Sequence, residues 1–122
     1  MKTHVLIIED NVYVKSLLEQ FLNPNFEVTV KSDGKEALEW LEDSNTTDLI
    51  ISDIMMPNLD GYQLLDNVKS SAYLHDIPVI MLSGLEKSEE RIKCFELGAA
   101  DYIVKPFNPQ ELQIRISRLI AA

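Results

Sequence analysis

Short runs of apolar, mainly β-branched residues alternate along the chain with longer segments in which apolar residues recur every three or four positions. Runs of the first kind are typical of buried strands, and segments of the second kind are typical of amphipathic helices. The predicted strands are residues 4–9, 26–31, 48–53, 78–82 and 101–104. The predicted helices are residues 12–22, 34–43, 61–72, 86–97 and 109–121. This alternation predicts an α/β fold in which helices cover both faces of a parallel sheet.

Helix-capping residues stand at several of the predicted boundaries. Asn11, Asp33 and Asn108 precede three of the helices, and their side chains can accept hydrogen bonds from the N–H groups of a first turn. Pro109 comes directly after Asn108, at the first helical position, where no N–H partner is lost. Gly98 follows the fourth predicted helix and suits the left-handed conformation of a helix C-terminus. The boundaries and the periodicity therefore agree.

The size and composition fit a single globular domain over residues 1–122, either a stand-alone domain or one excised from a longer protein. The chain has 122 residues, 46% of them apolar, which is enough to build a core without disulfide bonds. Its net charge of −9, from 20 acidic and 11 basic residues, argues against direct binding of nucleic acid by this domain. No signal peptide is visible and no apolar stretch approaches the ~20 residues of a membrane span. We therefore expect a cytoplasmic location without membrane contact.

Charged and hydroxyl side chains stand where the predicted strands end. Asp53 ends the third strand, Glu9 and Asp10 stand at the end of the first, and Ser83 and Lys105 follow the fourth and fifth. In an open parallel sheet, ligands bind beyond the carboxyl ends of the strands. Carboxylates that meet there repel each other, and a hard divalent cation relieves this repulsion. The pattern therefore predicts a cation site, and Mg²⁺, which prefers oxygen ligands, is the expected cofactor.

The residues of this edge have separate expected roles. Asp10 and Asp53 are predicted to bind Mg²⁺ directly, together with the main-chain carbonyl of Met55. Glu9 is expected to act through a water molecule or by orienting the site. Lys105 would neutralise the remaining negative charge and contact the oxygens of a phosphoryl group, which often completes the coordination of protein-bound Mg²⁺. The predicted chemistry is therefore that of a phosphoryl group held beside a cation.

Taken together, these features resemble the receiver domain of bacterial two-component response regulators, over the whole chain. The resemblance rests on Glu9-Asp10, Asp53 with the following Ile54-Met55-Met56-Pro57-Asn58-Leu59-Asp60-Gly61, Ser83, and Tyr102-Ile103-Val104-Lys105-Pro106-Phe107. It implies the flavodoxin-like three-layer (βα)5 sandwich with strand order 2-1-3-4-5. It also implies that Asp53 is the phosphoacceptor, with Ser83 and Tyr102 as a switch pair. By the same resemblance Lys105 contacts the phosphate, and its bond to Pro106 is cis.

The resemblance also implies a function. A sensor histidine kinase or a phosphotransfer protein would supply the phosphoryl group from a phosphohistidine, in a reaction that requires Mg²⁺. Such a domain is not a turnover enzyme, although it catalyses its own phosphorylation and dephosphorylation. On phosphorylation Ser83 would donate a hydrogen bond to the new phosphoryl group and Tyr102 would rotate inward. The surface expected to change consists of the fourth helix, the fifth strand and the fifth helix.

Three other classes of protein share parts of this pattern. A nucleotide or flavin binder of the same architecture needs a glycine-rich or hydroxyl-rich loop after the first strand, where this chain has the acidic sequence Glu9-Asp10-Asn11. A phosphatase with an aspartate nucleophile typically has a second aspartate two residues further on, and that position is Met55. The remaining alternative is a degenerate receiver, an interaction module that works without phosphorylation. Such modules usually lose the acidic pair, the acceptor or the lysine, and this chain has all three.

A homodimer on phosphorylation is a further expectation. Two stretches resemble regulators with a winged-helix DNA-binding output, residues 96–102 and 108–116. In that subfamily charged pairs across a two-fold axis join activated receivers. The matching pairs here are Arg91 with Glu111 and Asp101 with Arg115. The alternative is that these charges are simply solvated, because exposed ion pairs contribute only ~0.2–1 kcal/mol each.

Overall fold

The computed structural model describes residues 2–84 and 87–120. Strands and helices alternate within this part of the chain, in the order β1 (His4–Ile8), α1 (Val12–Leu22), β2 (Glu27–Lys31), α2 (Gly34–Glu42), β3 (Leu49–Asp53), α3 (Gly61–Ser70), β4 (Val79–Ser83), α4 (Ser88–Glu96), β5 (Asp101–Val104) and α5 (Pro109–Ile120). Every predicted element is present, and the predicted ends that can be compared differ from these by at most two residues. Residues 86 and 121, the predicted first residue of the fourth helix and last residue of the fifth, lie outside the described residues.

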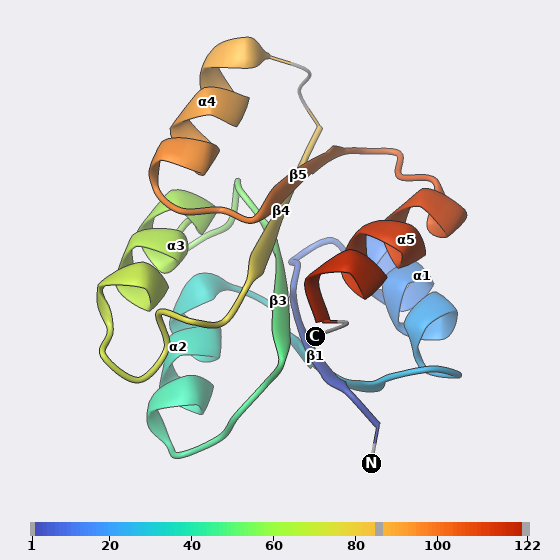
Figure 1. The fold of residues 1–122 in the computed structure, drawn as a ribbon, viewed down its shortest axis with the longest axis horizontal. Helices are drawn as coiled ribbons and strands as arrows, with labels where there is room; N and C mark the ends of the chain where they lie inside the picture. The colour runs from blue at the N-terminus through green and yellow to red at the C-terminus, as the bar shows by residue number, and fades with distance from the viewer. Residues whose placement is uncertain (1, 85–86, 121–122) are drawn as a thin grey trace.

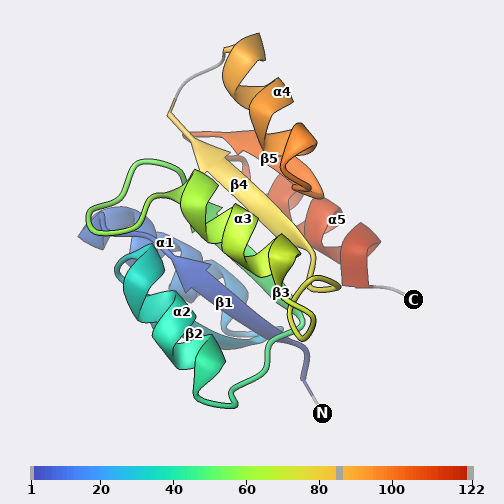
Figure 2. The same ribbon diagram turned by 90° about the vertical axis from the view of Figure 1, so that its left-hand side faces the viewer.

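The five strands form one parallel sheet in the order β2-β1-β3-β4-β5. Helices α1 and α5 cover one face, and α2, α3 and α4 cover the other, so the molecule has three layers (Figure 1). Figure 2 shows α2 and α3 in front of the sheet and α1 behind it. The predicted flavodoxin-like fold and its strand order are confirmed.

The hydrophobic core lies in two parts, one on each face of the sheet. Along β1, Val5 and Ile7 pack in the cluster under α1 and α5, whereas Leu6 and Ile8 pack in the cluster under α2, α3 and α4. Because successive side chains of a strand point to opposite faces, a strand buried on both faces is apolar throughout. This burial explains why the central strands have uninterrupted apolar runs. None of the helices in residues 2–84 and 87–120 combines the length and apolar character that crossing a bilayer requires.

Side-chain caps fix the starts of α1, α2, α3 and α5, three of them as predicted. Asn11 accepts hydrogen bonds from two first-turn N–H groups of α1, and Asp33 accepts one from α2. Asn108 does the same for two N–H groups of α5. Asp60 caps α3 in a reciprocal capping box. Gly98, two residues past the end of α4, has a φ of +105°, a conformation that strongly favours glycine.

Candidate functional site

The strand register brings four strand ends to one edge of the sheet. Ile8 at the end of β1 pairs with Ser52 of β3, and Ser83 at the end of β4 pairs with Val104 of β5. The strands are parallel and their carboxyl ends are level, so the residues at and just beyond these ends are neighbours. They are Glu9, Asp10, Asp53, Ser83 and Lys105.

Three carboxylates meet at this edge. Glu9, Asp10 and Asp53 each offer one carboxylate oxygen, and the three oxygens lie within 4.8 Å of one another. Glu9 is fully buried and Asp53 nearly so, whereas Asp10 is exposed to solvent. An all-oxygen donor set of this kind, open on one side, fits a Mg²⁺ ion, which binds one or two carboxylates and keeps several waters.

Lys105 places its ammonium group between two of these carboxylates. Its Nζ lies 3.0 Å from Glu9 Oε1 and 3.2 Å from Asp53 Oδ1. Burial lowers the pKa of Lys105, but the hydrogen bond to Glu9 and the charge of Asp53 outweigh burial, so that the pKa is raised. Burial raises the pKa of Glu9, and Lys105 offsets this only in part. One ammonium cannot balance three ionised carboxylates, so the charge of the cluster also fits a divalent cation.

Asp53 is held by backbone groups at the end of β3. Its Oδ1 accepts a hydrogen bond from the N–H of Ile54 at 2.9 Å, in addition to the contact with Lys105. Within residues 2–84 and 87–120, no group donates to its Oδ2. Gly61 at the start of α3 approaches so closely that a Cβ there would collide with the Asp53 carbonyl oxygen. Glycine at position 61 therefore lets α3 begin directly against the end of β3. The side chain of Met55 is exposed to solvent.

The predicted switch residues meet at a third side chain that the sequence did not single out. The hydroxyl groups of Ser83 and Tyr102 both donate to Oε1 of Glu90 in α4, the tyrosine at 2.7 Å. Tyr102 is only 7% exposed, and burial raises its pKa to about 12. The sequence led us to expect inward rotation of Tyr102 on phosphorylation, but its ring is already inside, because Glu90 provides an acceptor there.

No sequence signal identifies Glu90. It is one of two adjacent glutamates in the first turn of α4, and a charged residue there is ordinarily a solvated position that suits the helix dipole. Its contact with Ser83 depends on how α4 is oriented on the sheet, which periodicity does not determine. Only the spatial arrangement shows that this glutamate turns toward the sheet.

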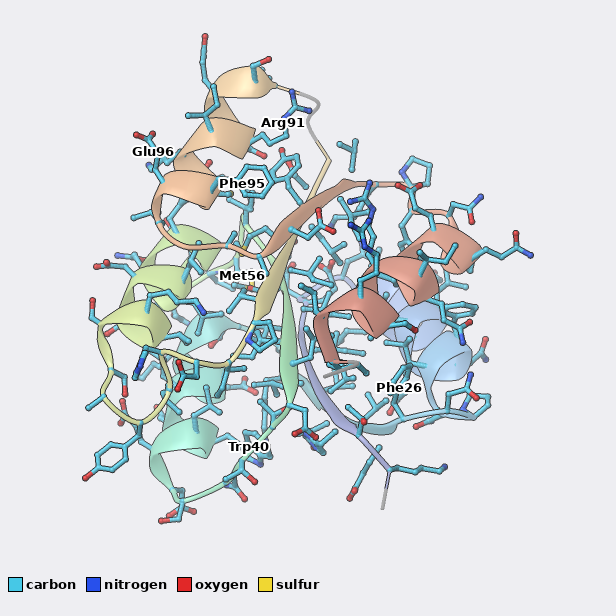
Figure 3. The ribbon with its side chains drawn as sticks, in the orientation of Figure 1. Phe26, Trp40, Met56, Arg91, Phe95 and Glu96 are labelled. Carbon is cyan, nitrogen blue, oxygen red and sulfur yellow. The ribbon has the colours of Figure 1, made fainter. Side chains whose placement is uncertain are left out.

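The predicted interface residues lie on α4, β5 and α5. Arg115 Nη1 lies 2.8 Å from both carboxylate oxygens of Asp101, and its Nη2 lies 2.9 Å from Glu111, all within one chain. The structure thus brings together three of the four residues predicted for a dimer contact, as an intramolecular cluster. Arg91 is exposed on α4, next to Phe95 on the side of the helix toward β5, with Glu96 on the opposite side (Figure 3).

The sequence of the chain matches a known protein family. The model of the response regulator receiver domain matches residues 5–117. The chain therefore belongs to the response regulator receiver domain family, whose general role is in two-component signalling.

Similar proteins and solved structures support this family assignment. A protein of Cyanophora paradoxa named "Probable transcriptional regulator ycf27" is 41% identical over 98% of this chain and 48% of its own length. The chain spans about half the length of the transcriptional regulators that it matches. The receiver domain of Francisella response regulator 1452 is 36% identical, with a TM-score of 0.90 over 98% of both chains. The receiver domain of the sensor histidine kinase PA1611 of Pseudomonas aeruginosa, with a magnesium ion in its active-site cleft, is 28% identical, with a TM-score of 0.90 over 100% of both chains.

Proposed function

We propose that this domain accepts a phosphoryl group on Asp53 from the phosphohistidine of a sensor histidine kinase or a phosphotransfer protein, in a Mg²⁺-dependent reaction. The observation that supports this proposal best is the meeting of Glu9, Asp10 and Asp53 within 4.8 Å, with the Lys105 ammonium among them. A cluster of this composition suits the stabilisation of negative charge on transferring phosphoryl oxygens. A cytoplasmic location is part of the same proposal.

In the proposed step, the carboxylate of Asp53 is the nucleophile. Its Oδ1 is restrained by the Ile54 N–H and by Lys105, which leaves Oδ2 as the oxygen that attacks phosphorus. The new O–P bond forms as the P–N bond breaks, and the electron pair of that bond stays on the imidazole nitrogen of the partner, which takes up a proton. Lys105 contacts the oxygens on which negative charge develops, and buried Glu9 holds the lysine in place.

The proposed cation ligands are Asp10, Asp53 and the main-chain carbonyl of Met55, with Glu9 acting through water or by orientation. When bound, Mg²⁺ supplies electrostatic stabilisation of the phosphoryl oxygens that one lysine cannot supply alone. The same residues would assist the later hydrolysis of the acyl phosphate by water. The domain would therefore catalyse its own phosphorylation and dephosphorylation without being a turnover enzyme, and the surface of α4, β5 and α5 would report its state.

Phosphorylation by acetyl phosphate tests this proposal directly. With Mg²⁺ present, we expect one phosphoryl group per chain, measured by intact-protein mass spectrometry and removed by hydroxylamine. D53N should abolish the labelling, and chelation of Mg²⁺ should abolish it in the wild type. D66N is the matched control, because Asp66 is an exposed aspartate of α3 away from the strand ends. Full labelling of D53N would move the acceptor elsewhere, and an unlabelled wild type would favour the phosphorylation-independent module.

A further inference from the structure

We propose that Glu90 is a positioning residue that competes with the phosphoryl group for the Ser83 hydroxyl, and so sets how readily the domain switches. The proposal rests on the proposed phosphorylation of Asp53. Glu90 belongs to α4 and is partly buried, with its carboxylate turned toward Ser83 of β4 and Tyr102 of β5. It is separate from the acids and the lysine that are proposed to hold the phosphoryl group.

In this structure the Ser83 hydroxyl already has an acceptor for its proton. Ser83 is the last residue of β4 and is 3% exposed, and its hydroxyl donates to Glu90 Oε1. A serine hydroxyl has a single proton to donate. A phosphoryl oxygen on Asp53, at the end of the adjacent strand β3, would need the same proton. Ser83 can therefore serve the phosphoryl group only by leaving Glu90.

The charge on Glu90 makes the competition strong. Hydrogen bonds to an ionised acceptor are about twice as strong as those between neutral groups. The Ser83–Glu90 bond and the Ser83–phosphoryl bond are both of this kind, so the free energy gained on switching is only the difference between them. A neutral acceptor at position 90 would hold the Ser83 proton less strongly and make the exchange more favourable.

The same carboxylate connects this exchange to the signalling surface. Glu90 also accepts from Tyr102 at 2.7 Å, and one turn further on the Lys93 ammonium lies 4.0 Å from the centre of the Tyr62 ring in α3. Helix α4 is thus tied to the sheet through Glu90 and to α3 through Lys93. When Ser83 leaves Glu90, the tie between β4 and α4 is broken while the tie to Tyr102 persists. Phosphorylation of Asp53 would thereby change the contacts that hold α4 on the sheet.

The variant E90Q tests the competition, because glutamine keeps the shape and one acceptor oxygen but removes the charge. E89Q is the matched control, since Glu89 is exposed in the same helical turn and its replacement removes the same charge. The measurement is the beryllofluoride concentration that gives half-maximal conversion with Mg²⁺, followed by backbone amide NMR of the full chain. We expect E90Q to need about fivefold less beryllofluoride than the wild type, and E89Q to be unchanged.

A double-mutant cycle with S83A separates competition from a general structural effect. If Glu90 acts through the Ser83 hydroxyl, E90Q should make no difference in the S83A background, and circular dichroism should show that all variants remain folded. An equal shift in both backgrounds, or no shift in E90Q, overturns the assignment. Acetyl phosphate labelling of Asp53 in the wild type and E90Q is run alongside. Intact labelling with no shift overturns the role of Glu90 alone, whereas an unlabelled wild type overturns the proposed function and this inference with it.

Discussion

The thiol of Cys94 is much less acidic in this fold than an ordinary cysteine thiol. It lies on the inner side of α4 and is fully buried in the cluster under α2, α3 and α4. Burial, with the charge of Glu90 one turn away, raises the pKa of its thiol to about 11 from an ordinary value of 9.0. At a pH well below 9, the fraction of reactive thiolate is therefore about 100-fold lower than that of a cysteine with the ordinary pKa.

We therefore expect Cys94 to react slowly with a thiol reagent in the folded domain. At pH 8 the rate with a disulfide reagent should be at least ~100-fold lower than that of the urea-unfolded chain, because the thiol is both neutral and covered. The rate should rise as the pH approaches 11, if the fold persists. The absorbance of the thiolate that the reagent releases gives the rate of reaction, and the unfolded chain is the control. Equal rates in folded and unfolded chains would contradict the burial of Cys94.

Individual site residues differ in how far the sequence could predict them. Glu9, Asp53 and Lys105 were found because parallel strands bring their carboxyl ends together whatever the details of packing. Glu90 was missed because its contact depends on how α4 is oriented on the sheet. The burial of Tyr102 was missed for the same reason, since its hydroxyl needs the acceptor that Glu90 provides.

At the scale of elements, capping side chains matter beyond the helix that they begin. Asp33 Oδ1 accepts from the N–H of Glu36 at 2.9 Å, and its Oδ2 accepts from the amide of Asn58 at 2.7 Å. Asp33 thus caps α2 and also holds the loop that runs from β3 to α3. The bond from Glu36 is the largest of the interactions that lower the pKa of Asp33. The ionised form is therefore favoured by the fold.

We expect D33A to lower the free energy of unfolding by about 1–2 kcal/mol at pH 7, as the loss of an N-cap does. Because the pKa of Asp33 is lowered in the folded state, its contribution is present above its unfolded pKa and is lost as the pH falls through the folded value. The difference between D33A and the wild type should therefore shrink below about pH 4. Urea unfolding at several pH values measures it.

D43A is the control on the same helix. Asp43 stands at the C-terminal end of α2, where a negative charge opposes the helix dipole, so its loss should be neutral or slightly stabilising. A D33A variant as stable as the wild type at pH 7 would contradict the capping role. A difference that persists unchanged at low pH would contradict the pH dependence.

Most element boundaries could be predicted because caps and periodicity act locally. The exception of most interest is α3, which ends at Ser70 although the sequence predicted residue 72. The hydroxyl of Ser71 accepts hydrogen bonds from the N–H groups of Tyr73 and Leu74, so this side chain organises the next turn instead of continuing the helix. Serine side chains compete with the helical backbone in this way, and helix periodicity does not record it.

At the scale of the whole molecule, the surface of α4, β5 and α5 is the candidate contact for a second copy. Arg115 is engaged with Asp101 and Glu111 of its own chain, which ties α5 to β5. A guanidinium has five N–H donors, so a dimer contact can add to these bonds without replacing them. Arg91 and Phe95 stand side by side on α4, facing β5 (Figure 3), and Phe95 is 45% exposed. An exposed aromatic beside complementary charges suits an interface between copies.

Sedimentation with beryllofluoride and Mg²⁺ tests this interface against the repulsion between two chains of net charge −9. We expect the activated wild type to form dimers, and R91E to weaken them about three- to tenfold, because two symmetric pairs with Glu111 are lost and each contributes ~0.2–1 kcal/mol. K35E is the matched control, since it changes the net charge equally from an exposed position on α2. It should weaken the dimer less than R91E does.

The double variant R91E/E111R should recover much of the association, because reversing both charges restores the pair across the two-fold axis although it removes the Glu111–Arg115 bond within each chain. The swap also returns the net charge to −9, so a specific contact is distinguished from overall repulsion by the difference between R91E and K35E, which have the same net charge. Added salt should reduce the difference between R91E and the wild type, as screening does for exposed pairs. A purely monomeric wild type at high concentration, or equal weakening by R91E and K35E, would contradict the proposed interface.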